Sequence, residues 1–119
     1  MKITKGFPGL VEESWCFRFA SSIETEGSIE IDLGNKWLIV SGRIEAGGGI
    51  EAGCGIKAGW GIEAGLSIRC KLVLSFAFHL FAGIASWKKA EGEDLVVEAK
   101  RIDGDVKYGT VRLLTEKSE

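Results

Sequence analysis

Residues 44–67 read IEAGGG, IEAGCG, IKAGWG and IEAGLS, four consecutive hexads of the form Ile-(Glu/Lys)-Ala-Gly-x-(Gly/Ser). The aliphatic first position recurs every six residues, and this spacing extends in both directions beyond the stretch. The full series is Phe17, Ile23, Ile29, then, after a three-residue insertion, Leu38, Ile44, Ile50, Ile56, Ile62, Ile68, Leu74 and Leu80. A fixed short period of this kind indicates a repeat architecture.

Within each hexad, apolar or small residues alternate with polar residues or glycine, and a period of two is typical of strands. Nine glycines between Gly42 and Gly65 exclude a helix, because each would cost about 0.5–1 kcal/mol in a helix interior. Short strands joined by short turns predict an all-β fold: a three-sided parallel β-helix (β-solenoid) in which three hexads close one triangular coil. We expect about four coils, at residues 17–34, 38–55, 56–73 and 74–91.

This layout predicts which side chains point into the solenoid. The expected inward columns are Phe17/Leu38/Ile56/Leu74, Ile23/Ile44/Ile62/Leu80 and Ile29/Ile50/Ile68/Ser86. Ser86 breaks its column, so we expect the regular stack to fray there. The same parity places Phe76 and Phe78 in the core.

The two ends of the chain are interpreted as caps on a single domain covering residues 1–119. Residues 1–16 form an irregular N-terminal cap, residues 17–91 the coils, and residues 92–119 a C-terminal β-hairpin cap. The hairpin is predicted from two strand-like runs on either side of Asp103-Gly104-Asp105. Capping of both ends is favoured over open edges that polymerise.

Composition limits the classes of function. The chain has 119 residues, 45% apolar residues and a net charge of −2, so it has enough apolar residues for a core and lacks the basic charge typical of nucleic-acid binding. It has no long apolar run and no signal-peptide pattern, and its three cysteines include no CxxC pair. We therefore expect a cytoplasmic protein with reduced thiols that binds neither membranes nor nucleic acid directly.

The hexads resemble those of hexapeptide-repeat β-helix proteins, and the resemblance covers residues 17–91. Ile44-Glu45 and Ile50-Glu51 with Cys54 fit the repeat, whereas the fifth position is unusually large at Trp60, Leu66, Leu72 and Phe78. The chain is similar as well to bactofilin-type scaffolds, which are short β-helices without catalytic groups. These resemblances imply a solenoid and, for bactofilins, self-assembly through its ends.

Few residues suggest catalysis. His79 is the only histidine, and hexapeptide-repeat acyltransferases use a histidine as general base, but here a surface residue is the favoured interpretation because no long loop interrupts the hexads. The cysteines Cys16, Cys54 and Cys70 match no zinc spacing and are interpreted as buried structural thiols. No metal or cofactor is expected.

The second position of the hexads predicts the charged surface. Glu24, Glu45 and Glu63 form one expected column capped by Phe81, and Glu30 and Glu51 followed by Arg69 form another. A third column carries Arg18, Ile39, Lys57 and Ser75. Because like charges on neighbouring strands are mildly destabilising, the acidic columns either solubilise the protein or bind a partner.

Phe81 and Trp87 have outward parity, and they either pack under the C-terminal cap or form a patch for a partner or a homodimer. The candidate binding residues are Glu24, Glu45, Glu63, Glu30, Glu51, Phe81 and Trp87.

The predicted function is a non-enzymatic protein-binding module whose acidic face engages a larger basic protein or nucleoprotein. In size and charge the chain is similar to the inhibitors that phages and mobile elements use against bacterial defence, anti-CRISPR proteins included. The alternative is a bactofilin-like self-assembling scaffold, and a hexapeptide acyltransferase using His79 is the third hypothesis.

Overall fold

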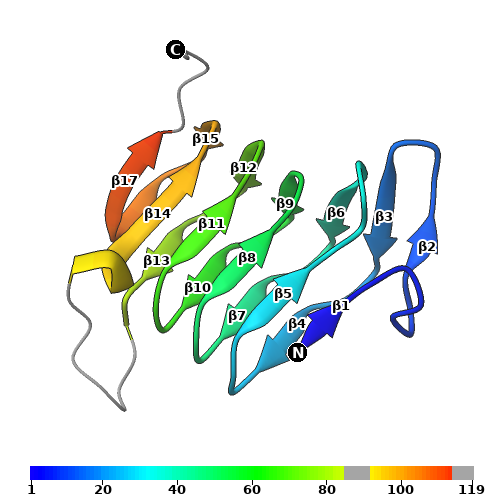
Figure 1. Cartoon of the computed structure of the whole chain (residues 1–119), viewed down its shortest axis with the longest axis horizontal. Helices are drawn as coiled ribbons and strands as arrows, with labels where there is room; N and C mark the ends of the chain where they lie inside the picture. Colours follow the sequence, from blue (N-terminus) through cyan, green and yellow to red (C-terminus); the bar gives the residue numbers. More distant parts are fainter. Residues whose placement is uncertain (85–91, 114–119) are drawn as a thin grey trace.

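A computed structural model of the chain describes residues 1–84 and 92–113. These residues form three sheets, all parallel except for one N-terminal strand, and the chain visits the sheets in turn as it winds. Strands from successive coils lie side by side, and the colours of Figure 1 run from blue at one end of the stack to red at the other. The predicted three-sided β-solenoid is confirmed.

Each sheet is one side of the solenoid. Sheet A contains, in spatial order, β1 (Lys2–Ile3), β5 (Ile29–Ile31), β8 (Ile50–Ala52), β11 (Ile68–Cys70), β14 (Val96–Ala99) and β17 (Thr110–Leu113). Sheet B contains β2 (Val11–Glu12), β3 (Cys16–Phe19), β6 (Trp37–Val40), β9 (Ile56–Ala58), β12 (Val73–Phe76) and β15 (Arg101–Asp103). Sheet C contains β4 (Ile23–Thr25), β7 (Ile44–Ala46), β10 (Ile62–Ala64), β13 (Leu80–Ala82) and β16 (Val106–Tyr108).

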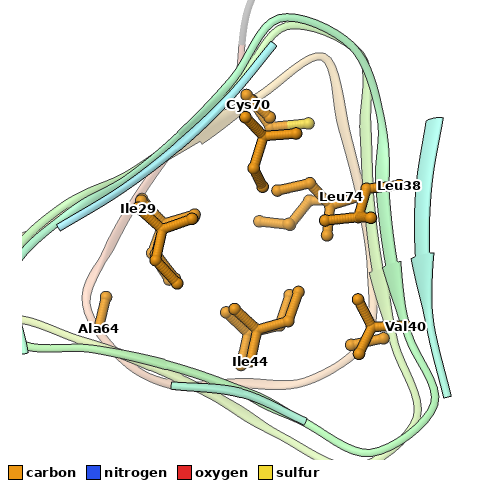
Figure 2. Packing of buried hydrophobic residues seen from close by; sticks show 14 of the residues in the cluster. Ile29, Leu38, Val40, Ile44, Ala64, Cys70 and Leu74 are labelled. Carbon is orange, nitrogen blue, oxygen red and sulfur yellow. The ribbon is translucent and has the colours of Figure 1, made fainter. Parts of the chain in front are cut away.

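The inward columns follow the six-residue period. Ile44 pairs with Ile62, and Ile62 pairs with Leu80, so that the aliphatic side chains stack directly over one another. Figure 2 looks along the solenoid and shows labelled side chains from all three sheets pointing into one triangular interior. The first-position residues from Phe17 to Leu80 are at most 3% exposed, because a short strand that faces the core on one side buries alternate residues.

Glycines at the corners allow neighbouring coils to approach closely. A Cβ atom on Gly47 would lie 2.1 Å from the Glu26 carbonyl oxygen, and one on Gly59 would lie 2.3 Å from the Ser41 carbonyl oxygen. Both contacts are with backbone that cannot move without breaking the stack. The glycine at the fourth hexad position is therefore required at these two corners by the spacing between coils.

The predicted C-terminal hairpin is wrong. Strands β15 and β16 do not pair with each other; β15 pairs in parallel with β12, and β16 pairs in parallel with β13. Together with β17 they complete a fifth coil, one more than the four expected. Gly104 forms a corner rather than a hairpin turn, with φ of 149°, and a Cβ atom there would lie 2.4 Å from the Phe76 ring. The aspartate-glycine signal marks a turn between two sides of the solenoid.

The Ser86 column is continued by another residue. Ile68 pairs with Val97 in β14, and Val97 in turn pairs with Val111 in β17. The short 3₁₀ helix η1 (Gly92–Leu95) leads into β14, and Ser86 lies outside the described residues. The inward column of sheet A therefore continues into the fourth coil, with Val97 in the place where the sequence analysis expected Ser86.

The N-terminal end of the stack is covered by the chain itself. Strand β1 pairs with β5 at the end of sheet A, and β2 pairs antiparallel with β3 at the end of sheet B. Between β1 and β2, Phe7 and Leu10 are partly buried against the core, and the Phe7 ring packs edge-on against Phe19 with 5.9 Å between centroids. At this end of the stack, the outermost strands of the three sheets are β1, β2 and β4.

Candidate functional site

The outward surface of sheet C, which we call face C, carries the first acidic column. Glu24 lies directly opposite Glu45, and Glu45 lies directly opposite Glu63 on the next strand. The column continues from Glu63 to Phe81 and then to Tyr108. The predicted order along this face is therefore present, and Tyr108 extends it by one coil beyond the sequence prediction.

The carboxylates of face C are only partly neutralised. Arg43, at the corner before β7, contacts Glu24 (Nη2 to Oε2, 3.1 Å) and more distantly Glu45 (Nε to Oε1, 3.9 Å). Among the described residues, no ion pair within 4.0 Å reaches Glu63. Partial burial, and then the negative charge of Glu63, raise the pKa of the Glu45 carboxyl above its ordinary value. The middle of the column therefore holds negative charge at some electrostatic cost.

Aromatic side chains gather where the acidic column ends. The Trp60 and Phe78 rings pack against each other in a tilted arrangement at the corner between sheets B and C, with 5.2 Å between centroids, and the His79 ring lies edge-on to Phe81 at 5.0 Å. Trp60 is 60% exposed, Phe78 56% and Tyr108 52%. We call these five residues the aromatic edge of face C. Exposed aromatic side chains that gather in one place are a feature of interaction surfaces.

Phe78 corrects a sequence prediction. Its parity placed it in the core, but it lies outside, whereas Phe76 is buried as predicted. The reason is the corner: at the turn between sheets B and C the fifth hexad position points away from the solenoid, so that Trp60 and Phe78 stack there on successive coils. At the turn after β8 the same position holds Cys54, which is buried and donates to the Asn35 carbonyl oxygen.

Glu30 and Glu51 are on a different side of the solenoid and do not join the face C residues. They occupy sheet A in a column in which the signs are mixed: Lys2, Glu30, Glu51, Arg69, Glu98 and Arg112. Glu93 binds both Arg69 (2.8 Å) and Arg112 (2.6 Å) across this column. The hydrogen bond from Arg112 is the main cause of the lowered pKa of Glu93.

A shallow groove of about 470 Å³ runs along sheet A. Glu30, Glu51, Arg69 and Glu98 lie along it, with Asp32 and Lys71 at the adjoining corner. The Nε atom of Arg69 is buried there without a hydrogen-bond partner, although its Nη2 atom is paired with Glu93. Because this groove carries both signs of charge along its strands, it lacks the uninterrupted column of three carboxylates that face C carries.

The remaining candidates from the sequence analysis are His79, the three cysteines and Trp87. His79 is half-buried against Phe81 at the aromatic edge. The three cysteines are buried and free, and the Cys70 thiol donates to the Cys54 carbonyl oxygen at 2.9 Å. Burial raises the pKa of the Cys70 thiol to about 11, so this thiol is neutral and unreactive at neutral pH. Trp87 lies outside the described residues.

Across residues 1–84 and 92–113, no three histidine, cysteine, aspartate or glutamate side chains are grouped so that they could hold a metal ion. No helix in this part of the chain is long and apolar enough to span a membrane.

Comparison with protein-family models, with curated proteins and with solved structures finds no match for the chain. The candidate site is therefore defined by the geometry of face C, an acidic column that runs directly into an exposed aromatic edge. The sequence pattern predicted the acidic column and Phe81. It missed Trp60, Phe78 and Tyr108 as binding residues. The large side chains of Trp60 and Phe78 at a corner position, and the tyrosine near the end of the chain, could have indicated them.

Proposed function

We propose that the protein is a non-enzymatic protein-binding module that engages the basic surface of a larger partner through face C. The observation that supports this proposal is the direct register of Glu24, Glu45 and Glu63 with Phe81 and Tyr108 on five neighbouring strands. Charge and exposed aromatic surface on one rigid side are the two components from which protein interfaces are built.

The chemistry of this face suits arginine or lysine side chains of a partner. A guanidinium group that approached Glu63 would gain a charge-assisted hydrogen bond, and its plane or stem could rest on the neighbouring Phe81 ring. Trp60, Phe78 and Tyr108 are half or more exposed, and tryptophan and tyrosine are over-represented among residues that dominate binding energy. We assign these aromatic side chains the larger share of the affinity and the carboxylates the orientation and association rate.

The strand pairing of sheet C makes face C a rigid surface. The central strands of sheet C pair with a neighbour on both sides, as β10 does with β7 and β13. A surface that is ordered before binding loses less conformational entropy when a partner docks. Face C is therefore a preorganised surface, which is how solenoid proteins commonly present their binding residues.

The test begins with affinity purification of the tagged protein from its host cells, followed by calorimetry with each protein retained. Reversing the column with Glu45→Lys/Glu63→Lys, or truncating the aromatic edge with Trp60→Ala, should abolish or weaken binding. For Trp60→Ala we expect a loss of about 2 kcal/mol, which is about a 30-fold rise in Kd.

The matched control for this test is Glu30→Lys/Glu51→Lys, which makes the same charge change on sheet A. Every variant is checked by far-UV circular dichroism for an intact solenoid. Binding that survives both face C variants would overturn the proposal, and so would binding lost only in the sheet A control. The second outcome would transfer the function to the groove beside Arg69.

A further inference from the structure

We propose that the C-terminal end of the solenoid is an interface at which a second copy of the chain docks tail to tail. The last coil ends on three strand edges, since β15, β16 and β17 each form the outer edge of their sheet among the described residues. Unpaired edges of this kind readily accept another strand.

Among the described residues, the core is open at this end. The inward column Ile29/Ile50/Ile68/Val97 is at most 1% exposed, whereas Val111, which continues it, is 47% exposed and Leu113 is 55% exposed. Ile102 and Val106, which continue the other two columns, are half-buried. Nothing described in this structure covers the last coil as Phe7 and Leu10 cover the first.

The two ends of the solenoid differ in how well the core is covered, and this difference favours tail-to-tail over head-to-tail docking. A head-to-tail chain of copies would have to seat the open last coil on the N-terminal end, but Phe7 and Leu10 cover the core there, and one outermost strand, β2, runs antiparallel to its neighbour. Docking end to end with an identical end instead brings together all three C-terminal edges of both copies. A two-fold axis across the solenoid then gives a closed dimer rather than a fibre.

Strand β15 is self-complementary about such an axis. If the axis passes through Ile102, each β15 pairs antiparallel with its counterpart, so that Arg101 of one copy lies opposite Asp103 of the other. The two side chains are already within 2.9 Å of each other in one chain, so they occupy the same outward surface. Opposite charges directly across antiparallel strands stabilise the pair, and the two Ile102 side chains meet across the opened core.

The test is sedimentation equilibrium of the full chain with three variants. The wild type should form a dimer, twice the monomer mass of 12.9 kDa. Asp103→Arg places like charges opposite each other at two symmetry-related points and should raise the dimer dissociation constant at least tenfold. The double swap Arg101→Asp/Asp103→Arg restores the complementary order and should return the constant to near the wild-type value.

The control is Lys57→Asp, which reverses a charge in the same outward column two coils away, as the Lys57–Ser75–Asp103 register shows. It should leave dimerisation unchanged. A monomer at millimolar concentration, assemblies larger than a dimer, or a dimer insensitive to Asp103→Arg would each overturn the proposal. These outcomes are independent of the partner-binding test, because none of the three variants changes a residue of face C.

Discussion

The substitution Ile56→Ala tests the stacked core most directly. Ile56 is 0% exposed, and it lies between Leu38 on one coil and Leu74 on the next. The change removes three carbon atoms, worth about 2.4 kcal/mol at roughly 0.8 kcal/mol per buried methylene. A cavity penalty is added, because neighbouring coils are held apart by their backbone pairing and cannot collapse into the space. We expect a loss of about 3–4 kcal/mol, within the range of about 2–5 kcal/mol seen for such truncations.

Urea titration followed by far-UV circular dichroism measures this loss, with an unchanged m-value as the sign that only stability is affected. Lys57→Ala is the matched control, because the adjacent side chain is exposed and should change stability by less than about 0.5 kcal/mol. Ile56→Asp should leave no folded protein, since an unpaired buried carboxylate costs a large part of the roughly 5–15 kcal/mol that stabilise a domain. Equal tolerance of Ile56→Ala and Lys57→Ala would refute the inward assignment.

Three further predictions follow from individual contacts. Gly47→Ala should destabilise the solenoid by more than about 1 kcal/mol in the same titration, because the added Cβ would collide with backbone. Gly53→Ala is the control: a Cβ there would have nothing within 4 Å, so this change should be neutral or slightly stabilising. Glu45→Gln should stabilise the protein at pH 7, because the wild-type carboxyl has a raised pKa in the folded state and its ionisation therefore favours unfolding as the pH rises through that pKa. The gain should vanish well below 4.5, the ordinary pKa of this group, where the carboxyl is protonated in both the folded and the unfolded state. At pH 8 a thiol reagent should leave Cys70 unmodified in native protein and modify it once urea is added, since this thiol is buried with a pKa near 11; rapid native modification would contradict its placement.

The repeat made the inner coils predictable. Between Ile44 and Ile68 the six-residue spacing and the short-strand pattern agree at every hexad, so the register followed from the sequence alone. The last coil could not be predicted in the same way, because Ile102 and Val106 are only four residues apart. A turn between two sides of a solenoid and a turn between two hairpin strands use the same residue types, and only the strands beneath decide between them.

The candidate site was predictable where it lies on a strand and not where it lies on a corner. Glu45 and Glu63 occupy second hexad positions, whose outward direction is fixed by strand alternation. Trp60 and Phe78 occupy corners, where alternation does not apply and the direction depends on which two sheets meet. Arg43 was missed for the same reason, although its contact with Glu24 alters the charge of the whole face.

The step from β13 to β14 has a practical use. The chain leaves sheet C after β13, η1 leads into β14, and Val97 is in register with Ile68 on the neighbouring coil. Each turn of the ribbon is fastened to the turns above and below it, so the length of the connection at one corner does not alter the winding elsewhere. A fluorescent label, an epitope or an entire foreign domain could be spliced in at this position, and the flanking layers would keep their alignment.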